Sequence, residues 1–110
     1  MYKSIIEFIE KGTIKIEKIT KESLLSGNMM CFEEELIDTV LEFDRSLYQE
    51  ILESIEQTIR NSEVRKQSYY VEHKEDHRTL LTRFGNIEIT RAYYLSKQDR
   101  KGIYLLDKYV

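Results

Sequence analysis

The sequence predicts an α+β fold in which one long amphipathic helix packs on a small antiparallel sheet of three or four strands. Between about Met30 and Asn61, apolar residues recur every three or four positions, which is the period of a helix with one buried face. After Asn61 the apolar residues alternate, and β-branched and aromatic residues become frequent, which is typical of strands. A length of 110 residues suits one domain with a core of its own.

We expect this domain to consist of three consecutive parts. They are a helical lead at residues 1–27, the long helix at residues 28–66 and an antiparallel hairpin sheet at residues 67–110. In the lead, the apolar spacing predicts a short helix that ends near Gly12, whereas residues 14–24 fit a strand or a helix.

The long helix would span roughly 45 Å at the usual rise per residue, which is more than a small sheet can cover. Either the helix is interrupted near Asp44–Ser46, or a second chain or further protein buries part of its apolar stripe. Glu33–Glu35 lie in its first turns, where carboxylates favour the positive end of the helix dipole. Because consecutive helical residues point in different directions, we expect a solvated helix start there and not a catalytic carboxylate pair.

Three strands are predicted at Tyr69–Lys74, His77–Phe84 and Ile87–Leu95, with Ile103–Leu106 as a candidate fourth. Gly85-Asn86 is a two-residue hairpin signal, because both residues tolerate positive φ. A turn at that place would pair Phe84 with Ile87, Arg83 with Glu88 and Thr82 with Ile89.

Few residues offer chemistry of their own. His73 and His77 have a spacing that can ligate zinc on a helix, but they fall where we expect a polar turn between two strands. We therefore predict a solvated turn and no metal site. Cys31 precedes the long helix and has no histidine near it in sequence to act as a base, so we expect a buried or partly buried filler. As the single cysteine, it excludes a disulfide framework and suits a reducing cytoplasm.

The charges are divided unevenly along the chain. Residues 1–55 hold six basic and twelve acidic side chains, net −6, and residues 56–110 hold eleven and eight, net +3. The basic half also contains the tyrosine pairs Tyr69-Tyr70 and Tyr93-Tyr94. Cations for phosphates and rings for stacking suit a nucleic-acid surface, although half-buried strands favour tyrosine too. A tyrosine nucleophile would need a converging Arg/His cluster, which the order of residues does not assemble.

The basic residues that we expect to contact DNA phosphates are Arg78, Arg83, Arg91, Arg100 and Lys101. The first ten residues interrupt their apolar side chains with Glu7 and Glu10, unlike a signal peptide, and no run approaches membrane-spanning length. We therefore expect a cytoplasmic protein without a membrane partner. The apolar run at residues 103–110 suggests a piece of a longer protein.

Four short motifs follow one another in the chain. They are an acidic leading helix, a Thr-x-x-Thr-x-x-Gly strand and turn, an Arg-x-x-Tyr strand and a Tyr-Leu-Leu-Asp segment. The last three stand at Thr79, Thr82, Gly85, Arg91, Tyr94, Tyr104, Leu105, Leu106 and Asp107. As a set they resemble the N-terminal region of the ISLre-type insertion-sequence transposases, a bacterial family also catalogued among the uncharacterised protein families. The likeness covers residues 30–110 and is strongest after Arg78.

The resemblance implies a non-catalytic N-terminal module of a longer DNA transposase, which would help to bind or position transposon-end DNA. In such enzymes a ribonuclease-H-like domain further along the chain holds divalent metal ions such as Mg²⁺ with carboxylates. None of those carboxylates is carried over to this chain, so we expect no catalysis and no cofactor here. One alternative is an oligomerisation module in which the long helix pairs with a second copy as a homodimer. Another is a truncated remnant without its own activity.

Overall fold

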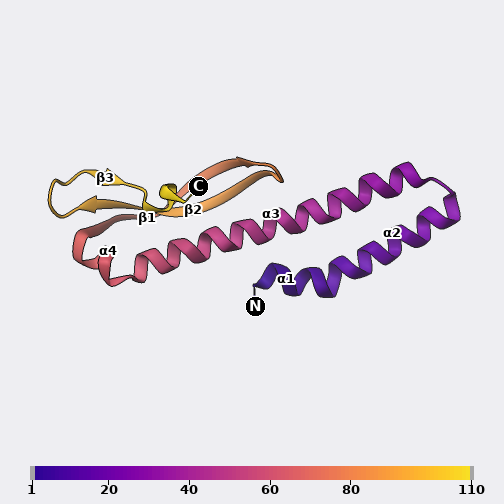
Figure 1. Ribbon diagram of the computed structural model, residues 1–110, viewed down its shortest axis with the longest axis horizontal. Helices are drawn as coiled ribbons and strands as arrows, with labels where there is room; N and C mark the ends of the chain where they lie inside the picture. Colours follow the sequence, from indigo (N-terminus) through magenta and orange to yellow (C-terminus); the bar gives the residue numbers. More distant parts are fainter. Residues whose placement is uncertain (1, 110) are drawn as a thin grey trace. The chain divides into compact units, whose positions relative to one another are not determined.

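The computed structural model describes residues 2–109 and has the predicted α+β class (Figure 1). Met1 and Val110, which begin the predicted lead and end the predicted sheet region, lie outside the described residues. In chain order the elements are α1 (Lys3–Glu7), a π-helical turn (Phe8–Gly12), α2 (Thr13–Ser26), α3 (Met29–Asn61), α4 (Glu63–Ser68), β1 (Tyr69–Thr82), β2 (Gly85–Ser96), β3 (Gly102–Ile103) and a 3-10 helix (Leu105–Lys108). None of the helices within residues 2–109 is long and apolar enough to span a membrane.

The chain forms two compact units. The first comprises the chain through Glu50 together with Thr82–Gly85, and the second comprises Ile51–Leu81 and the chain from Asn86 onward.

In the first unit, the lead is helical from Lys3 to Ser26, and the predicted helix end near Gly12 was wrong. Gly12 has ordinary helical dihedrals, and one glycine inside a helix costs only about 1 kcal/mol, which packing can offset. The helix ends instead at Gly27, whose φ of 70° is the left-handed conformation of a helix C-terminus. The Gly27 N–H donates to the carbonyl of Ser23 at 2.8 Å.

The long helix α3 begins after Asn28, which caps it. Its Oδ1 accepts hydrogen bonds from the N–H groups of Met30 and Cys31 at 3.2 and 3.4 Å. Cys31 is exposed, so the predicted buried filler was wrong. The residue lies in the first turn of α3, where the amide of Asn28 and not an apolar neighbour approaches its sulfur, at 3.3 Å.

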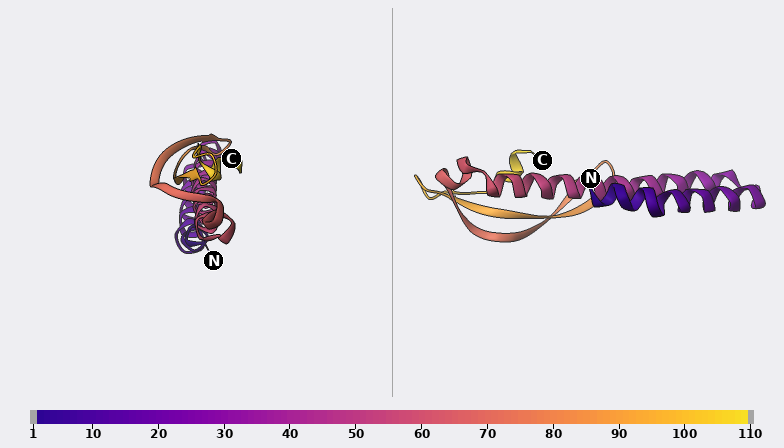
Figure 2. Two further views of the ribbon diagram at one scale, coloured as in Figure 1. Left: turned by 90° about the vertical axis from the view of Figure 1, so that its left-hand side faces the viewer. Right: turned by 90° about the horizontal axis from the view of Figure 1, so that it is seen from below.

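No interruption occurs near Asp44–Ser46, because α3 is one helix through Asn61. The lead packs on the first part of its apolar stripe, which the sequence did not indicate, and leaves Ile37 and Val40 of the stripe exposed. The ring centres of Phe8 and Phe43 lie 4.4 Å apart, and Lys15 forms an ion pair with Glu42 at 3.8 Å. Figures 1 and 2 show α2 running antiparallel beside this part of α3.

The turn between β1 and β2 lies at Arg83 and Phe84, two residues before the predicted position. Positive φ falls on Gly85, at 114°, while Asn86 remains in the strand, so Gly85-Asn86 does not form the turn. Thr82 closes the loop instead: its hydroxyl accepts from the Phe84 N–H at 3.1 Å and donates to the Gly85 carbonyl at 2.7 Å. The predicted register, which pairs Phe84 with Ile87, Arg83 with Glu88 and Thr82 with Ile89, was therefore wrong.

The two strands predicted at Tyr69–Lys74 and His77–Phe84 merge into the single strand β1, which ends at Thr82, two residues before the predicted end. The predicted polar turn around His73 and His77 was wrong, because other elements hold this stretch extended. The guanidinium of Arg60 donates to the Lys74 carbonyl at 2.9 Å, and the Tyr104 hydroxyl donates to Asp76 at 2.9 Å. Four positions along a strand separate two Cα atoms by about 13 Å, which is too far for the two histidines to share an ion.

The sheet has the order β1-β2-β3, and β3 pairs antiparallel with β2 at Tyr94↔Ile103 and Leu95↔Gly102. Figure 2 shows β1 and β2 as a strongly curved ribbon. The predicted fourth strand at Ile103–Leu106 is the short β3 followed by the 3-10 helix. A core of Ala92, Tyr94 and Leu105 packs against Ile59 of α3, so the long helix packs on the sheet as predicted.

Candidate nucleic-acid interface

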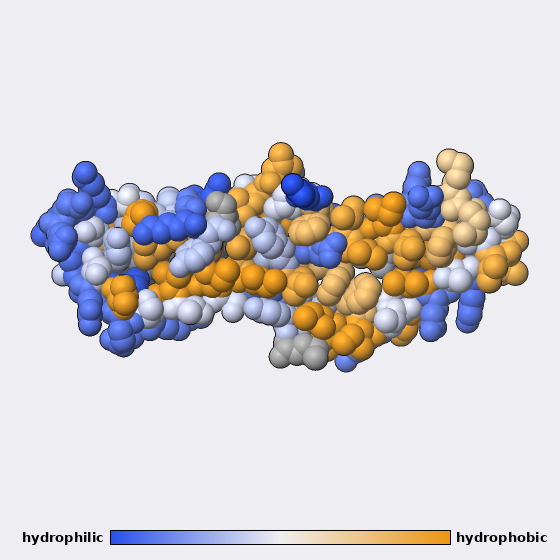
Figure 3. All heavy atoms as spheres, viewed as in Figure 1, coloured by the Kyte–Doolittle hydropathy of each residue, from blue (hydrophilic) through white to orange (hydrophobic). Residues whose placement is uncertain are grey.

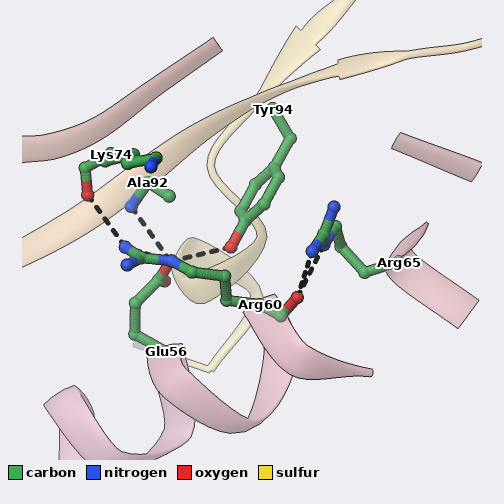
Figure 4. A network of polar contacts seen from close by, with 6 residues as sticks. All are labelled: Glu56, Arg60, Arg65, Lys74, Ala92 and Tyr94. Atoms are coloured by element: carbon green, nitrogen blue, oxygen red, sulfur yellow. Dashed lines mark hydrogen bonds and ion pairs between the residues drawn. The ribbon is translucent and has the colours of Figure 1, made fainter. Parts of the chain in front are cut away.

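A buried carboxylate joins α3 to β2 (Figure 4). Glu56 is 4% exposed, and its Oε1 accepts from the Ala92 N–H at 3.0 Å and from the Tyr94 hydroxyl at 2.9 Å. Arg60, one helical turn later, lies 4.0 Å from the same oxygen and also bonds β1 through the Lys74 carbonyl. Burial, followed by the hydrogen bond and the charge of Glu56, raises the pKa of Tyr94 to about 12.

The buried Tyr94 therefore anchors the sheet to the helix. The sequence carries one signal of this anchor. Glu56 follows Leu52 by four residues on the apolar stripe of α3, and an acid at such a position needs a buried partner.

A second group of polar residues contains two of the five predicted DNA contacts. The Asp107 carboxylate accepts hydrogen bonds from the guanidinium groups of Arg78, at 3.0 Å, and of Arg91. The Arg91 side chain is 13% exposed, and its guanidinium lies 3.7 Å from the centre of the Tyr104 ring. The hydrogen bond to Asp76 raises the pKa of Tyr104, with smaller contributions from burial and from the charge of Asp76.

Most of the motif residues make contacts within the two units or are buried in them. Arg91, Tyr104 and Asp107 form the group just described, and Leu105 and Leu106 are buried. Tyr94 bonds Glu56, and Thr82 bonds the Gly85 carbonyl across the hairpin turn. Thr79 is exposed on β1. At these positions the motif residues therefore stabilise the fold of this chain.

The remaining predicted contacts are exposed. Arg83 lies in the hairpin turn and belongs to the first unit. Arg100 and Lys101 lie in the loop between β2 and β3, and Arg100 takes a left-handed φ of 56°. Two backbone bonds shape this loop: Ser96 N–H to the Lys101 carbonyl at 3.0 Å, and Arg100 N–H to the Ser96 carbonyl at 3.0 Å. Figure 3 shows hydrophilic residues over this end of the sheet.

Beside this loop, within the second unit, lies a groove of about 650 Å³. Its walls come from the end of α3, from α4, from the start of the β2–β3 loop and from the 3-10 helix. Three charged side chains line it, Arg65, Lys97 and Lys108, and no carboxylate is among the described residues that do so. We call it the cationic groove. None of these three cations was among the DNA contacts predicted from the sequence.

Arg65 and Lys97 are positioned by carbonyl groups at the ends of helices. The guanidinium of Arg65 donates from Nε to the Arg60 carbonyl at 2.9 Å and from Nη1 to the Tyr69 carbonyl at 3.4 Å. Lys97 Nζ donates to the Lys66 carbonyl at 2.6 Å and lies 4.8 Å from the centre of the Tyr70 ring. Because these acceptors are neutral, the groove keeps the positive charge of both side chains, which helix C-termini stabilise.

The comparisons with known proteins identify the family. A family model described as "Uncharacterised protein family (UPF0236)" matches residues 22–110. The chain belongs to this family. A UPF0236 protein of Caldanaerobacter subterraneus subsp. tengcongensis is 29% identical over 119 aligned residues, which cover 89% of this chain and 24% of the relative.

Another UPF0236 protein of the same organism is 38% identical over 63 residues, which cover 57% of this chain and 13% of the relative. The chain thus spans about a quarter of the length of the first of these UPF0236 relatives. No solved structure matches it.

Proposed function

We propose that this UPF0236 chain is a non-catalytic, DNA-binding module of a transposase and helps to position transposon-end DNA. The observation that carries the proposal is the cationic groove, whose three charged lining residues are all basic. Arg100 and Lys101 extend the positive charge along the adjacent loop. A phosphate backbone is the polyanion that such a surface suits, because its binding is driven by neutralising phosphates and releasing counterions.

The transposase part of the proposal rests on the family resemblance of the motifs and on the greater length of the relatives. In a full-length protein of this kind, the divalent ions and the carboxylates that hold them would belong to the protein beyond these 110 residues. This chain would contribute binding and orientation of the DNA.

The structure changes which residues we assign to phosphates. Arg78 and Arg91 share the carboxylate of Asp107, which offsets one of their two positive charges and holds both side chains within the fold, and the Arg91 side chain is only 13% exposed. We assign phosphate contacts instead to Lys97, Lys108, Arg100 and Lys101, and we retain Arg83 as a separate contact in the hairpin turn.

Titration of a fluorescently labelled transposon-end duplex tests the proposal. Its affinity should fall linearly with the logarithm of salt concentration between about 50 and about 200 mM, with a slope proportional to the phosphates neutralised. Replacing Arg100 and Lys101 with Gln should lower that slope by about 2, and the matched change of Lys3 and Lys21 in the lead should leave it unchanged. Negligible binding to end and scrambled duplexes alike at low salt would contradict the proposal.

The alternative function, an oligomerisation module, is favoured by a different observation in the first unit. Large apolar side chains are exposed there on both helical segments, among them Ile9, Ile14 and Ile37. Figure 3 shows this apolar surface over α2 and the first part of α3.

Sedimentation analysis at high micromolar concentration tests the alternative. A homodimer through this surface should dissociate when Ile9 and Ile14 are replaced with Glu, whereas the matched exposed pair Val64 and Leu81 should tolerate the same change without loss of dimer. A strictly monomeric mass of the unaltered chain would contradict the alternative.

A further inference from the structure

We infer that the cationic groove holds one unpaired nucleotide at the end of the bound DNA, with the base inside the groove and its phosphate at the cationic rim. This inference rests on the proposed function and adds the form of DNA that the groove takes. It follows from the lining, the charges and the size of the groove.

The lining of the groove combines aliphatic and aromatic surface. Ile59 and Leu105 contribute apolar surface that belongs to the core or packs against it. Val64 is 74% exposed and Tyr109 is 63% exposed, so two large apolar side chains face open space where the groove meets solvent. Flat apolar walls beside an exposed aromatic ring suit the face of a base, which stacks on aromatic side chains without regard to sequence.

The rim supplies the charges that a nucleotide phosphate needs. Arg65, Lys97 and Lys108 line the same groove. Arg65 and Lys97 donate hydrogen bonds to neutral carbonyl groups, and no carboxylate is among the described residues that line the groove. Gln67 and Gln98 also line the groove and are exposed. Their amide groups can both donate and accept hydrogen bonds, as the polar edge of a base requires.

The size of the groove distinguishes an unpaired nucleotide from a duplex. A volume of about 650 Å³ lies within the range of pockets that take small organic molecules. A paired base stays stacked inside the duplex and presents only its backbone and groove edges. An unpaired base at a DNA end can leave the stack at low cost and enter.

Fluorescence anisotropy with two DNA molecules tests this inference. One is a blunt duplex, and the other is the same duplex with two unpaired nucleotides at one end. The unaltered chain should bind the second DNA about tenfold more tightly, which lies within the contribution expected of one stacked base. Equal binding of the two DNA molecules would overturn the inference while leaving the proposed function intact, and absence of binding to both would overturn both.

Variants of Tyr109 locate the preference in the groove. Tyr109→Ala should reduce the tenfold preference to about twofold or less, whereas Tyr109→Phe should retain it, because the ring is what stacks. Lys108→Gln should weaken the binding of the DNA with unpaired nucleotides, and the matched change Lys74→Gln, on β1 and outside the groove lining, should not. A Tyr109→Ala protein with a wild-type melting curve and an undiminished preference would overturn the inference.

A free mononucleotide tests whether the groove takes a DNA end or a small nucleotide. Deoxyadenosine monophosphate at the concentration of the labelled DNA should leave the preference in place, because the backbone contacts of a tethered nucleotide add to its binding. Loss of the preference at that concentration would overturn the assignment to a DNA end.

Discussion

The Tyr94 hydroxyl of β2 donates a 2.9 Å hydrogen bond to the carboxylate of Glu56 on α3, and both residues are buried. The same carboxylate oxygen accepts the Ala92 N–H, so one acid fixes both a side chain and the backbone of the strand to the helix. Because an unpaired carboxylate is costly in a protein interior, this pairing holds the sheet at one position along the helix.

Removal of the Tyr94 hydroxyl should therefore destabilise the chain. In Tyr94→Phe the ring remains packed, but Glu56 loses one of its donors, and we expect a loss of about 1–2 kcal/mol in the free energy of unfolding. Urea denaturation measures the change. Tyr70→Phe is the matched control, since Tyr70 is exposed on β1, and it should change the stability by less than about 0.5 kcal/mol. Equal stabilities of the two variants would contradict the role of the hydroxyl.

The stability of the chain should fall at alkaline pH as Tyr94 ionises. Its pKa is raised to about 12 in the folded state from 10.0, so the unfolded chain loses this proton first and deprotonation favours unfolding. The contribution of Tyr94, about 2 kcal/mol, is complete below pH 10 and is lost as the pH rises toward 12.

Unfolding free energies measured from pH 9 to pH 12 check this second prediction. In Tyr94→Phe the alkaline loss should be smaller by that amount. Tyr104, whose pKa is also raised, titrates in both proteins and cancels from the comparison. The same pH dependence in both proteins would show that Tyr94 does not contribute.

The sequence was sufficient to predict the long helix, because its apolar stripe repeats over the whole of α3 and the spacing of that stripe is a local signal. The sequence was insufficient to predict the strand at the centre of β1, where a run of charged residues is typical of a turn. There the backbone is held extended by Arg60, which lies 14 positions before the Lys74 carbonyl that it binds, and by Tyr104, which lies 28 positions after Asp76. The hairpin turn was predicted at the wrong position for a local reason. The positive φ of Gly85 belongs to the first residue after the turn and not to a residue of the turn itself.

The candidate site was only partly predictable for the same reason. A surface arginine and an arginine with a partner are indistinguishable in sequence when that partner is distant. Asp107 lies 16 positions from Arg91 and 29 from Arg78, and no periodicity connects them. Lys97 and Arg65 line the same groove because the β2–β3 loop folds back on α4. The hydrogen bond from the Lys97 N–H to the Ser68 carbonyl holds the loop there.

Replacement of Arg91 should lower stability. The guanidinium of this largely buried side chain lies on the Tyr104 ring and bonds Asp107, so Arg91→Ala should cost about 2 kcal/mol through the lost charge-assisted bond and the lost packing. Thermal melting monitored by circular dichroism measures the effect. Arg83→Ala, an exposed arginine in the hairpin turn, is the matched control and should melt within a degree or so of the unaltered chain. An Arg91→Ala protein that melts with its control would return Arg91 to the candidate DNA contacts.

Replacing each of the two glycines with positive φ by alanine should lower the free energy of unfolding by different amounts. At Gly27, φ is 70° and nothing lies within 4 Å of an added Cβ, so Gly27→Ala should cost about 1–2 kcal/mol, the strain of the left-handed conformation. At Gly85, φ is 114°, which is less accessible to alanine, and an added Cβ would lie 3.3 Å from the Arg45 side chain.

Arg45 also donates to the Phe84 carbonyl at 2.7 Å, so moving its side chain away would break a bond of the hairpin turn. Gly85→Ala should therefore destabilise the chain by at least about 1 kcal/mol more than Gly27→Ala in the same urea denaturation. If the two substitutions cost the same, the contact with Arg45 would contribute nothing to the turn, and strain of the backbone alone would explain why glycine stands at both positions.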